Sequence, residues 1–266
     1  MAAGAQGTNS FATQREGNQN VMSLTLVIGN KNYSSWSMRP WVLLKQFGLP
    51  FEEIMLKFES REWSDQIARV APSRKVPTLW DGQVGTSESI VVWDTIAIIE
   101  YIAERFPQLD IWPKNIAARA MARAVAAEMH AGFQALRSSM PMNIRSQHPG
   151  KGMKPGVAED IARIEAIWRA AREQFGGRTT APFLFGEFCA ADAMFAPVVM
   201  RFATYAPPIS VASAQYCEVM KAAAGVAAWN AEALAETEFV GFDEPYAKSA
   251  TSATSATQST PATPPT

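Results

Sequence analysis

The chain has 266 residues, 48% of them hydrophobic, and a formal net charge of -1. This length holds one large domain or two small ones with a sizeable core. The near-neutral charge argues against a nucleic-acid-binding surface, and no stretch approaches the roughly 18 uninterrupted apolar residues of a membrane span.

Both ends of the chain are predicted to be disordered. Residues 1–22 are mostly small and polar and lack the apolar core of a secretory signal, and Met22 is a candidate translation start. Residues 247–266 contain a Ser-Ala-Thr repeat and end in Thr and Pro, which is typical of a disordered tail.

The first part of the folded chain, residues 23–106, predicts a small α/β domain. Strands are expected at 24–28, 51–58, 76–80 and 89–93, with helices at 36–47, 63–70 and 94–106. The order is therefore β-α-β-α-β-β-α, with the first two strands parallel and the last two forming an antiparallel hairpin. This order predicts a thioredoxin-like sheet.

The second part of the chain predicts an all-helical domain. Residues 107–115 contain two prolines and are interpreted as a linker. Beyond it, over 116–246, strand patterns give way to alanine-rich amphipathic segments. The fold class is thus α/β plus all-α, a thioredoxin-like domain followed by a helical bundle. Helices are expected at 116–139, 156–175, 190–204, 211–224 and 226–236.

Cysteine and histidine are too sparse for a disulfide framework or a metal site. The chain has only Cys189, Cys217, His130 and His148, in no ligand-like spacing. We expect no metal, and a reducing compartment, the cytoplasm. His130 is interpreted as a packed or capping histidine rather than a catalytic base.

Three short motifs, in this order and at these intervals, resemble the glutathione transferase superfamily. They are Tyr33-Ser34-Ser35-Trp36-Ser37-Met38-Arg39, Lys75-Val76-Pro77-Thr78-Leu79 and Trp93-Asp94-Thr95-Ile96-Ala97-Ile98. The resemblance extends over both domains, and it is greatest to bacterial serine-type members, with zeta-like paired serines. It implies a cytoplasmic, homodimeric detoxification enzyme that uses glutathione as co-substrate and transfers it to a small hydrophobic electrophile.

The resemblance implies that the hydroxyl of Ser34 activates glutathione, with Ser35 as the second candidate for this role. A hydroxyl that donates a hydrogen bond to sulfur, beside the free N–H groups of a helix start, stabilises the thiolate. Because Pro40 is tolerated best in a first helical turn, Ser37 is the better N-cap, and an irregular turn is expected over 34–37. The alternative is that all three serines only cap the helix.

The other two motifs are implied to hold the rest of glutathione. A cis Val76–Pro77 bond would present the Val76 backbone to an extended peptide, and Lys75 would meet the glycyl carboxylate or stay solvated. Asp94 and Thr95 stand where the family has Glu or Gln followed by Ser, and would bind the γ-glutamyl ammonium and carboxylate. The alternatives are a trans proline and a plain N-cap pair.

The electrophile pocket is expected between the domains, near residues 128–145. Phe133 and Met142 are candidates for its apolar lining, and Arg137 or Arg145 for holding an anionic substrate. Two other functions stay open: a glutathione-dependent isomerase, favoured by the paired serines, and a non-catalytic binding module. A thiol-disulfide reductase is disfavoured, because a serine stands where such enzymes need cysteine.

Overall fold

The computed structural model describes residues 24–176 and 182–247, and the segments predicted to be disordered lie outside this part, except for residue 247. The first domain has the element order that the sequence predicts. Its elements are β1 (Leu24–Ile28), α1 (Ser35–Gln46), β2 (Phe51–Met55), α2 (Arg61–Val70), β3 (Thr78–Asp81), β4 (Ile90–Trp93) and α3 (Thr95–Arg105).

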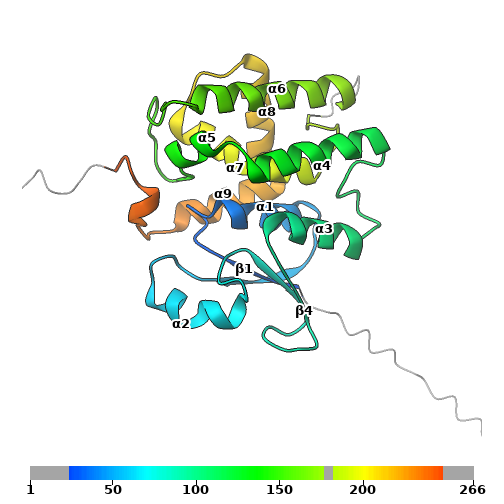
Figure 1. Ribbon diagram of the computed structural model, residues 1–266, viewed down its shortest axis with the longest axis vertical. Coiled ribbons are helices and arrows are strands. Elements are labelled where there is room, and N and C mark those ends of the chain that lie inside the picture. Colours follow the sequence, from blue (N-terminus) through cyan, green and yellow to red (C-terminus); the bar gives the residue numbers. More distant parts are fainter. Residues whose placement is uncertain (1–23, 177–181, 248–266) are drawn as a thin grey trace, which may run out of the picture.

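The four strands form one mixed sheet in the order β2-β1-β3-β4. β1 is parallel to β2 and antiparallel to β3, and β3 is antiparallel to β4, which confirms the thioredoxin-like domain. β2 ends at Met55 instead of residue 58, because the Phe58 N–H turns to donate to Asn30 Oδ1 at 2.7 Å. α1 and α3 lie on the sheet face toward the helical domain, and α2 lies on the other face (Figure 1).

The second domain is helical, as the sequence predicts. Its elements are α4 (Ile116–Ala131), α5 (Gln134–Ser139), α6 (Val157–Phe175), α7 (Ala190–Tyr205), α8 (Val211–Ala222), α9 (Ala224–Ala235) and a 3₁₀ turn, η1 (Gly241–Asp243). The helix predicted over 116–139 is in fact two helices. The chain breaks at Gly132 and Phe133, where Phe133 adopts a left-handed backbone with φ of 59°, and α5 leaves in a new direction.

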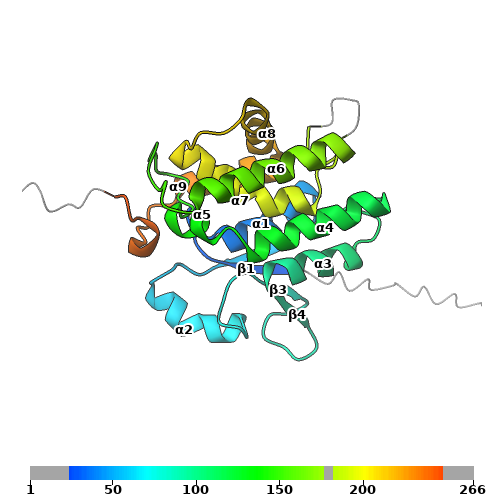
Figure 2. The ribbon, with the colours of Figure 1, turned by 45° about the horizontal axis from the view of Figure 1, so that its top comes forward.

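The domains pack together through α1, which contacts α7 and α9 as well as the sheet. In Figure 2, α4 lies beside α3 above the same face of the sheet. α7 is buried along almost its whole length. The N-terminus of α1 therefore lies at the boundary between the domains, with the start of α3 and the break between α4 and α5 around it.

Asp192 fixes the start of α7 as the acidic member of a capping box with Cys189. Its carboxylate accepts hydrogen bonds from the Cys189 and Leu184 N–H groups at 3.0 and 3.1 Å and from the Tyr216 hydroxyl at 2.9 Å. Complete burial raises the pKa of Asp192 to about 6.

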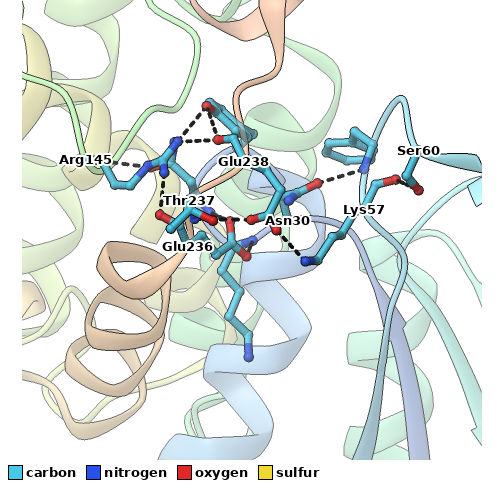
Figure 3. A network of polar contacts seen from close by, with 11 residues as sticks. Asn30, Lys57, Ser60, Arg145, Glu236, Thr237 and Glu238 are labelled. Atoms are coloured by element: carbon cyan, nitrogen blue, oxygen red, sulfur yellow. Dashed lines mark hydrogen bonds and ion pairs between the residues drawn. The ribbon is translucent and has the colours of Figure 1, made fainter. Parts of the chain in front are cut away.

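The segment after α9 returns to the first domain and is tied there by polar contacts (Figure 3). The Arg145 guanidinium donates to the Glu236 and Glu238 carbonyls. The Glu236 carboxylate accepts from the Lys31 and Asn32 N–H groups at 2.6 and 3.0 Å. These contacts hold the segment beside the residues that precede α1.

Within the described ranges, 24–176 and 182–247, no helix is both long and apolar enough to cross a membrane.

Candidate functional site

Two cavities lie side by side at the N-terminus of α1. The larger, of about 560 Å³, is lined by Ser34 and Ser35 and by residues of the helical domain. The smaller, of about 500 Å³, reaches the start of α3. They share Trp36, Lys75 and Val76 as lining residues, so the motifs that are far apart in sequence surround one continuous site.

Ser34 is the N-cap of α1. Its Oγ accepts from the Ser37 N–H at 3.4 Å and lies 2.7 Å from Ser37 Oγ, which accepts from the Gly29 N–H at 3.2 Å. The expectation that Ser37 caps the helix after an irregular turn is wrong, because the helix is regular from Ser35, with the Met38 N–H donating to Ser34 C=O at 3.0 Å. The serine that caps the helix therefore also lines the larger cavity, as Ser35 does.

Pro40 lies in the second turn of α1 without leaving a carbonyl unpaired. Because proline has no N–H, the Trp36 carbonyl four residues earlier loses its helical partner. The Thr95 hydroxyl takes that place and donates to the Trp36 carbonyl at 3.0 Å. Thr95 lines the smaller cavity, but its hydroxyl proton is already engaged. A ligand carboxylate in this cavity would meet the N–H groups at the start of α3 instead.

The Val76–Pro77 peptide bond is cis, as the sequence predicts. Val76 lines both cavities, and its backbone N–H and C=O have no hydrogen-bond partner within the described part of the chain. Both groups are thus available to an extended peptide. Lys75 is exposed and lines both cavities, and Pro77 lines the smaller one.

Asp94 caps α3 and also pairs with a residue of the helical domain. It has φ of 75°, accepts from the Ile96 N–H at 3.0 Å and lies 2.9 Å from His130 Nε2. The His130 ring in turn packs edge-on against Trp36, with 5.1 Å between the ring centroids. Such a left-handed backbone at a non-glycine residue is strained and is often found at functional sites. His130 is a packed histidine, as interpreted from the sequence, but one that lines the smaller cavity.

Two of the four residues predicted for the electrophile pocket line the larger cavity. Arg137 and Met142 do so, whereas Phe133 is buried at the break between helices. Arg145 is engaged by the C-terminal segment (Figure 3) and has its Nη2 3.0 Å from the Tyr33 hydroxyl. Sequence reasoning missed Arg201, which also lines this cavity. Its signal was the only basic residue in the apolar helix 190–205, in which Asp192 is the other charged residue.

Three arginines in or beside the site are shielded from solvent to different extents: Arg39 and Arg201 are buried, and Arg137 is half-buried. Burial lowers the pKa of Arg39 and of Arg137, and lowers the pKa of Arg201 to about 10. Arg39 is structural, since its Nε donates to the Met194 carbonyl at 3.0 Å and its guanidinium lies 4.2 Å from the Trp36 ring centroid. Among the residues described, no three His, Cys, Asp or Glu side chains gather as a metal site would require.

Comparison with known proteins assigns both halves of the chain to one family. Residues 33–105 match the family model "Glutathione S-transferase, N-terminal domain", and residues 154–231 match "Glutathione S-transferase, C-terminal domain". Between them, the two models cover more than half of the chain.

Curated relatives match over part of their length. A "Probable maleylacetoacetate isomerase" of Caenorhabditis elegans is 29% identical over 138 residues, which are 50% of this chain and 60% of that protein. "Glutathione S-transferase theta-1" of Mus musculus is 30% identical over 136 residues, 48% of this chain and 54% of that protein. The matched region thus spans little more than half the length of these relatives.

Solved structures match over most of their length. A Burkholderia glutathione transferase homologue with bound glutathione has a TM-score of 0.58 and 23% identity, covering 79% of this chain and 98% of that one. Human glutathione S-transferase T1-1 has a TM-score of 0.57 and 20% identity, covering 80% and 90%. At these identities the similarity shows a shared fold.

Proposed function

The chain belongs to the glutathione S-transferase superfamily, and from this premise we propose that it is a glutathione transferase with a serine-activated thiol. It binds glutathione across the two cavities and transfers the thiolate to a small electrophile with a hydrophobic body. The observation that carries this proposal is the position of Ser34, which caps α1 and lines the larger cavity together with Val76, whose backbone groups have no partner among the described residues.

Ser34 would act as a hydrogen-bond donor to the glutathione sulfur. A thiol with a pKa of about 8.5 is mostly protonated at neutral pH, and each unit of pKa depression needs about 1.4 kcal/mol of preferential thiolate stabilisation. In this structure the Ser34 O–H donates to Ser37 Oγ at 2.7 Å. Because a hydroxyl proton rotates freely, the Ser34 O–H can turn from Ser37 to the sulfur when glutathione is bound. The positive end of α1 adds to the effect.

The rest of glutathione would lie along the first domain. The cysteinyl backbone would pair with the N–H and C=O of Val76, and the γ-glutamyl carboxylate would lie at the N-terminus of α3, near the Thr95 N–H. The γ-glutamyl ammonium would meet the Asp94 carboxylate, and Lys75 would face the glycyl carboxylate. The support for this placement is that the smaller cavity is lined by all four residues, Lys75, Val76, Asp94 and Thr95. Val76 also lines the larger cavity, where Ser34 lies.

In the transfer step the thiolate forms a sulfur–carbon bond with the electrophile. The displaced electron pair leaves with a halide or similar leaving group, or moves onto a conjugated carbonyl that then takes a proton from water. The thiol proton is released to solvent before the attack. The Ser34 hydroxyl donates a hydrogen bond that stabilises the thiolate until the sulfur–carbon bond forms, and the hydroxyl itself is never ionised.

A glutathione-dependent isomerase is the second candidate. Two of the curated relatives are named as maleylacetoacetate isomerases, at 29% and 26% identity, and the paired Ser34 and Ser35 favour the same activity. An isomerase adds the thiolate to a cis double bond and expels it after rotation, so glutathione is regenerated. A transferase consumes it.

The test is calorimetric binding of glutathione, followed by assays that count glutathione consumed against substrate changed. We expect binding and consumption of one glutathione per electrophile. Isomerisation of a cis-enone acid without thiol loss would establish the second candidate. Absence of glutathione binding would contradict both and leave a non-catalytic binding module.

We also propose that the protein is a cytoplasmic homodimer, as the resemblance implies. The support for the dimer is that Ile90 and Trp93 on β4 are each 47% exposed, beside α3, which the family uses for its dimer contact. Sedimentation equilibrium tests it, and a monomer at micromolar concentration would contradict it.

A further inference from the structure

The larger cavity carries a strong positive charge. Among its described lining residues, four are basic and one, Asp243 of η1, is acidic. Two of the basic residues, Arg74 and Lys75, are exposed on the first domain. The other two, Arg137 and Arg201, come from the helical domain, so the charge lies on both sides of the cavity.

Arg201 is a buried cation with no salt-bridge partner among the described residues, and the Asp243 carboxylate of the same cavity acts on it only through space. Arg201 is 4% exposed, and its Nε donates to the Met140 carbonyl at 2.8 Å and its Nη1 to the Pro197 carbonyl at 3.3 Å. Within the described ranges it forms no ion pair with a carboxylate, and its Nη2 donates to no protein atom. Burying an unpaired charge is costly, so an anion that enters the cavity would be attracted to it.

Arg137 is held in place on the neighbouring helix α5. Its Nη1 donates to the His130 and Gly132 carbonyls at 3.3 Å each, and its guanidinium lies 4.5 Å from the Trp36 ring centroid. Its Nε and Nη2 have no partner in the part of the chain that the structure describes. A guanidinium fixed in this way loses little freedom when it binds a planar carboxylate.

We propose that the electrophile carries a carboxylate, which Arg137 and Arg201 bind while its apolar body packs on Met142 and its reactive carbon faces Ser34. The carboxylates of glutathione have other partners in the proposed function: the γ-glutamyl carboxylate lies at the start of α3 and the glycyl carboxylate faces Lys75. Arg137 and Arg201, which line the larger cavity but not the smaller one, are therefore left for the electrophile. This inference rests on the proposed function, since it identifies the class of electrophile for that site.

The test compares a chlorodinitrobenzoate with its methyl ester, two electrophiles that differ in charge but share the reacting carbon. In both, the glutathione sulfur forms a bond to the ring carbon, chloride leaves with the electron pair, and the thiol proton goes to solvent. The quantity measured is the ratio of kcat/KM for the acid to kcat/KM for the ester. Within each variant, the ester controls for folding and thiol activation.

We expect the ratio to fall by roughly 10-fold to 100-fold in Arg137→Gln, the range for losing a hydrogen bond to a charged group. Arg201→Gln should lower the ratio by a similar factor. Arg201→Lys keeps the charge but lacks the planar guanidinium, so it should lower the ratio by a smaller factor. If Arg201→Gln does not fold, Arg201→Lys and Arg137→Gln carry the test. Arg163→Gln removes an equal charge from α6, where Arg163 pairs with Glu128, and should leave the ratio unchanged.

A binding measurement separates failure of this inference from failure of the proposed function. The glutathione conjugates of the acid and of the ester, prepared chemically, are titrated into each variant by calorimetry. Suppose that both conjugates bind wild type, and that Arg137→Gln and Arg201→Lys each weaken binding of the acid conjugate and of the ester conjugate by the same factor. The arginines are then structural, and only this inference is overturned. If neither conjugate binds wild type, the proposed function is overturned and this inference with it.

Discussion

The two walls of the cleft are built in different ways. The first-domain wall, formed by Ser34, Ser35, Lys75 and Val76, offers backbone groups, hydroxyls and one ammonium, all from residues in short motifs. The helical-domain wall, formed by Arg137, Met142 and Arg201, uses side chains brought together by three segments of the chain. Backbone chemistry suits a constant ligand such as glutathione, whereas side chains can change one by one with the electrophile. In the proposed function, this difference separates thiol activation on the first domain from substrate choice on the helical domain.

The largest effect is expected at the first-domain wall. Ser34→Ala removes the proposed donor to sulfur, and kcat/KM for the neutral ester should fall by roughly 100-fold to 1,000-fold at neutral pH, the cost of losing one such donor. Steady-state kinetics measures it.

Ser210 provides a matched control for that substitution. It caps α8 as Ser34 caps α1, with its Oγ 3.0 Å from the hydroxyl three residues later, Ser213 Oγ. Ser210→Ala should cost about 1 kcal/mol of unfolding free energy, as loss of a cap does, and leave kcat/KM unchanged. Equal losses of activity in both variants would mean that Ser34 only caps.

The second prediction concerns the core that supports the helical-domain wall. Because the pKa of Asp192 is raised to about 6 from 3.8, the folded protein binds its proton more tightly than the unfolded chain does. The protonated carboxyl therefore contributes on the order of 3 kcal/mol to the free energy of unfolding. This contribution is fully present below pH 4 and is lost as the pH rises through 6.

Asp192→Asn has no charge to titrate, so it should remove this dependence. Unfolding by urea at pH 4 and pH 7 measures it, and the stability difference between wild type and variant should change with pH. A difference that stays constant between the two pH values would show that Asp192 does not titrate in this range. The bound thiol should be unaffected in either case.

The third prediction tests the contact that lets α1 contain Pro40. Thr95→Val keeps the shape of the side chain but leaves the Trp36 carbonyl without a donor, which should cost about 1–3 kcal/mol of stability. In a Pro40→Ala background the new N–H of residue 40 can reach that carbonyl, so the same change should cost clearly less. Additive losses in the double variant would contradict this pairing.

The smallest effect is expected from Asp243, the acidic residue in the described lining of the larger cavity. Asp243→Asn removes the carboxylate that competes with an acidic electrophile near Arg201, so the acid-to-ester ratio should rise, by roughly 2-fold to 5-fold for a partly solvated charge. The same kinetics measures it. An unchanged ratio would mean that Asp243 does not face the bound electrophile.

The residues of the first-domain wall could be located from sequence because they lie in short motifs. The cis bond before Pro77 was predicted from a proline at the start of a strand. Neighbouring residues alone favoured Ser37 as the N-cap, whereas the family resemblance pointed to Ser34, which is the N-cap in the structure. The helical-domain wall depends on the break at Gly132 and on the packing of α7, and neither periodicity nor composition places Arg201 beside Arg137. The same limit hid the contact of Thr95 with Trp36, which joins residues 59 positions apart, and the replacement of Arg145 by Arg201 in the cavity.

The central claim is that Ser34 stabilises the thiolate of bound glutathione, and the ultraviolet absorbance of that thiolate as a function of pH tests it most directly. With wild-type protein saturated with glutathione, we expect the thiol to titrate at least one pH unit below its free value, and to return toward that value in Ser34→Ala. A bound thiol that titrates at the free value in wild type, or identically in both proteins, would contradict the account.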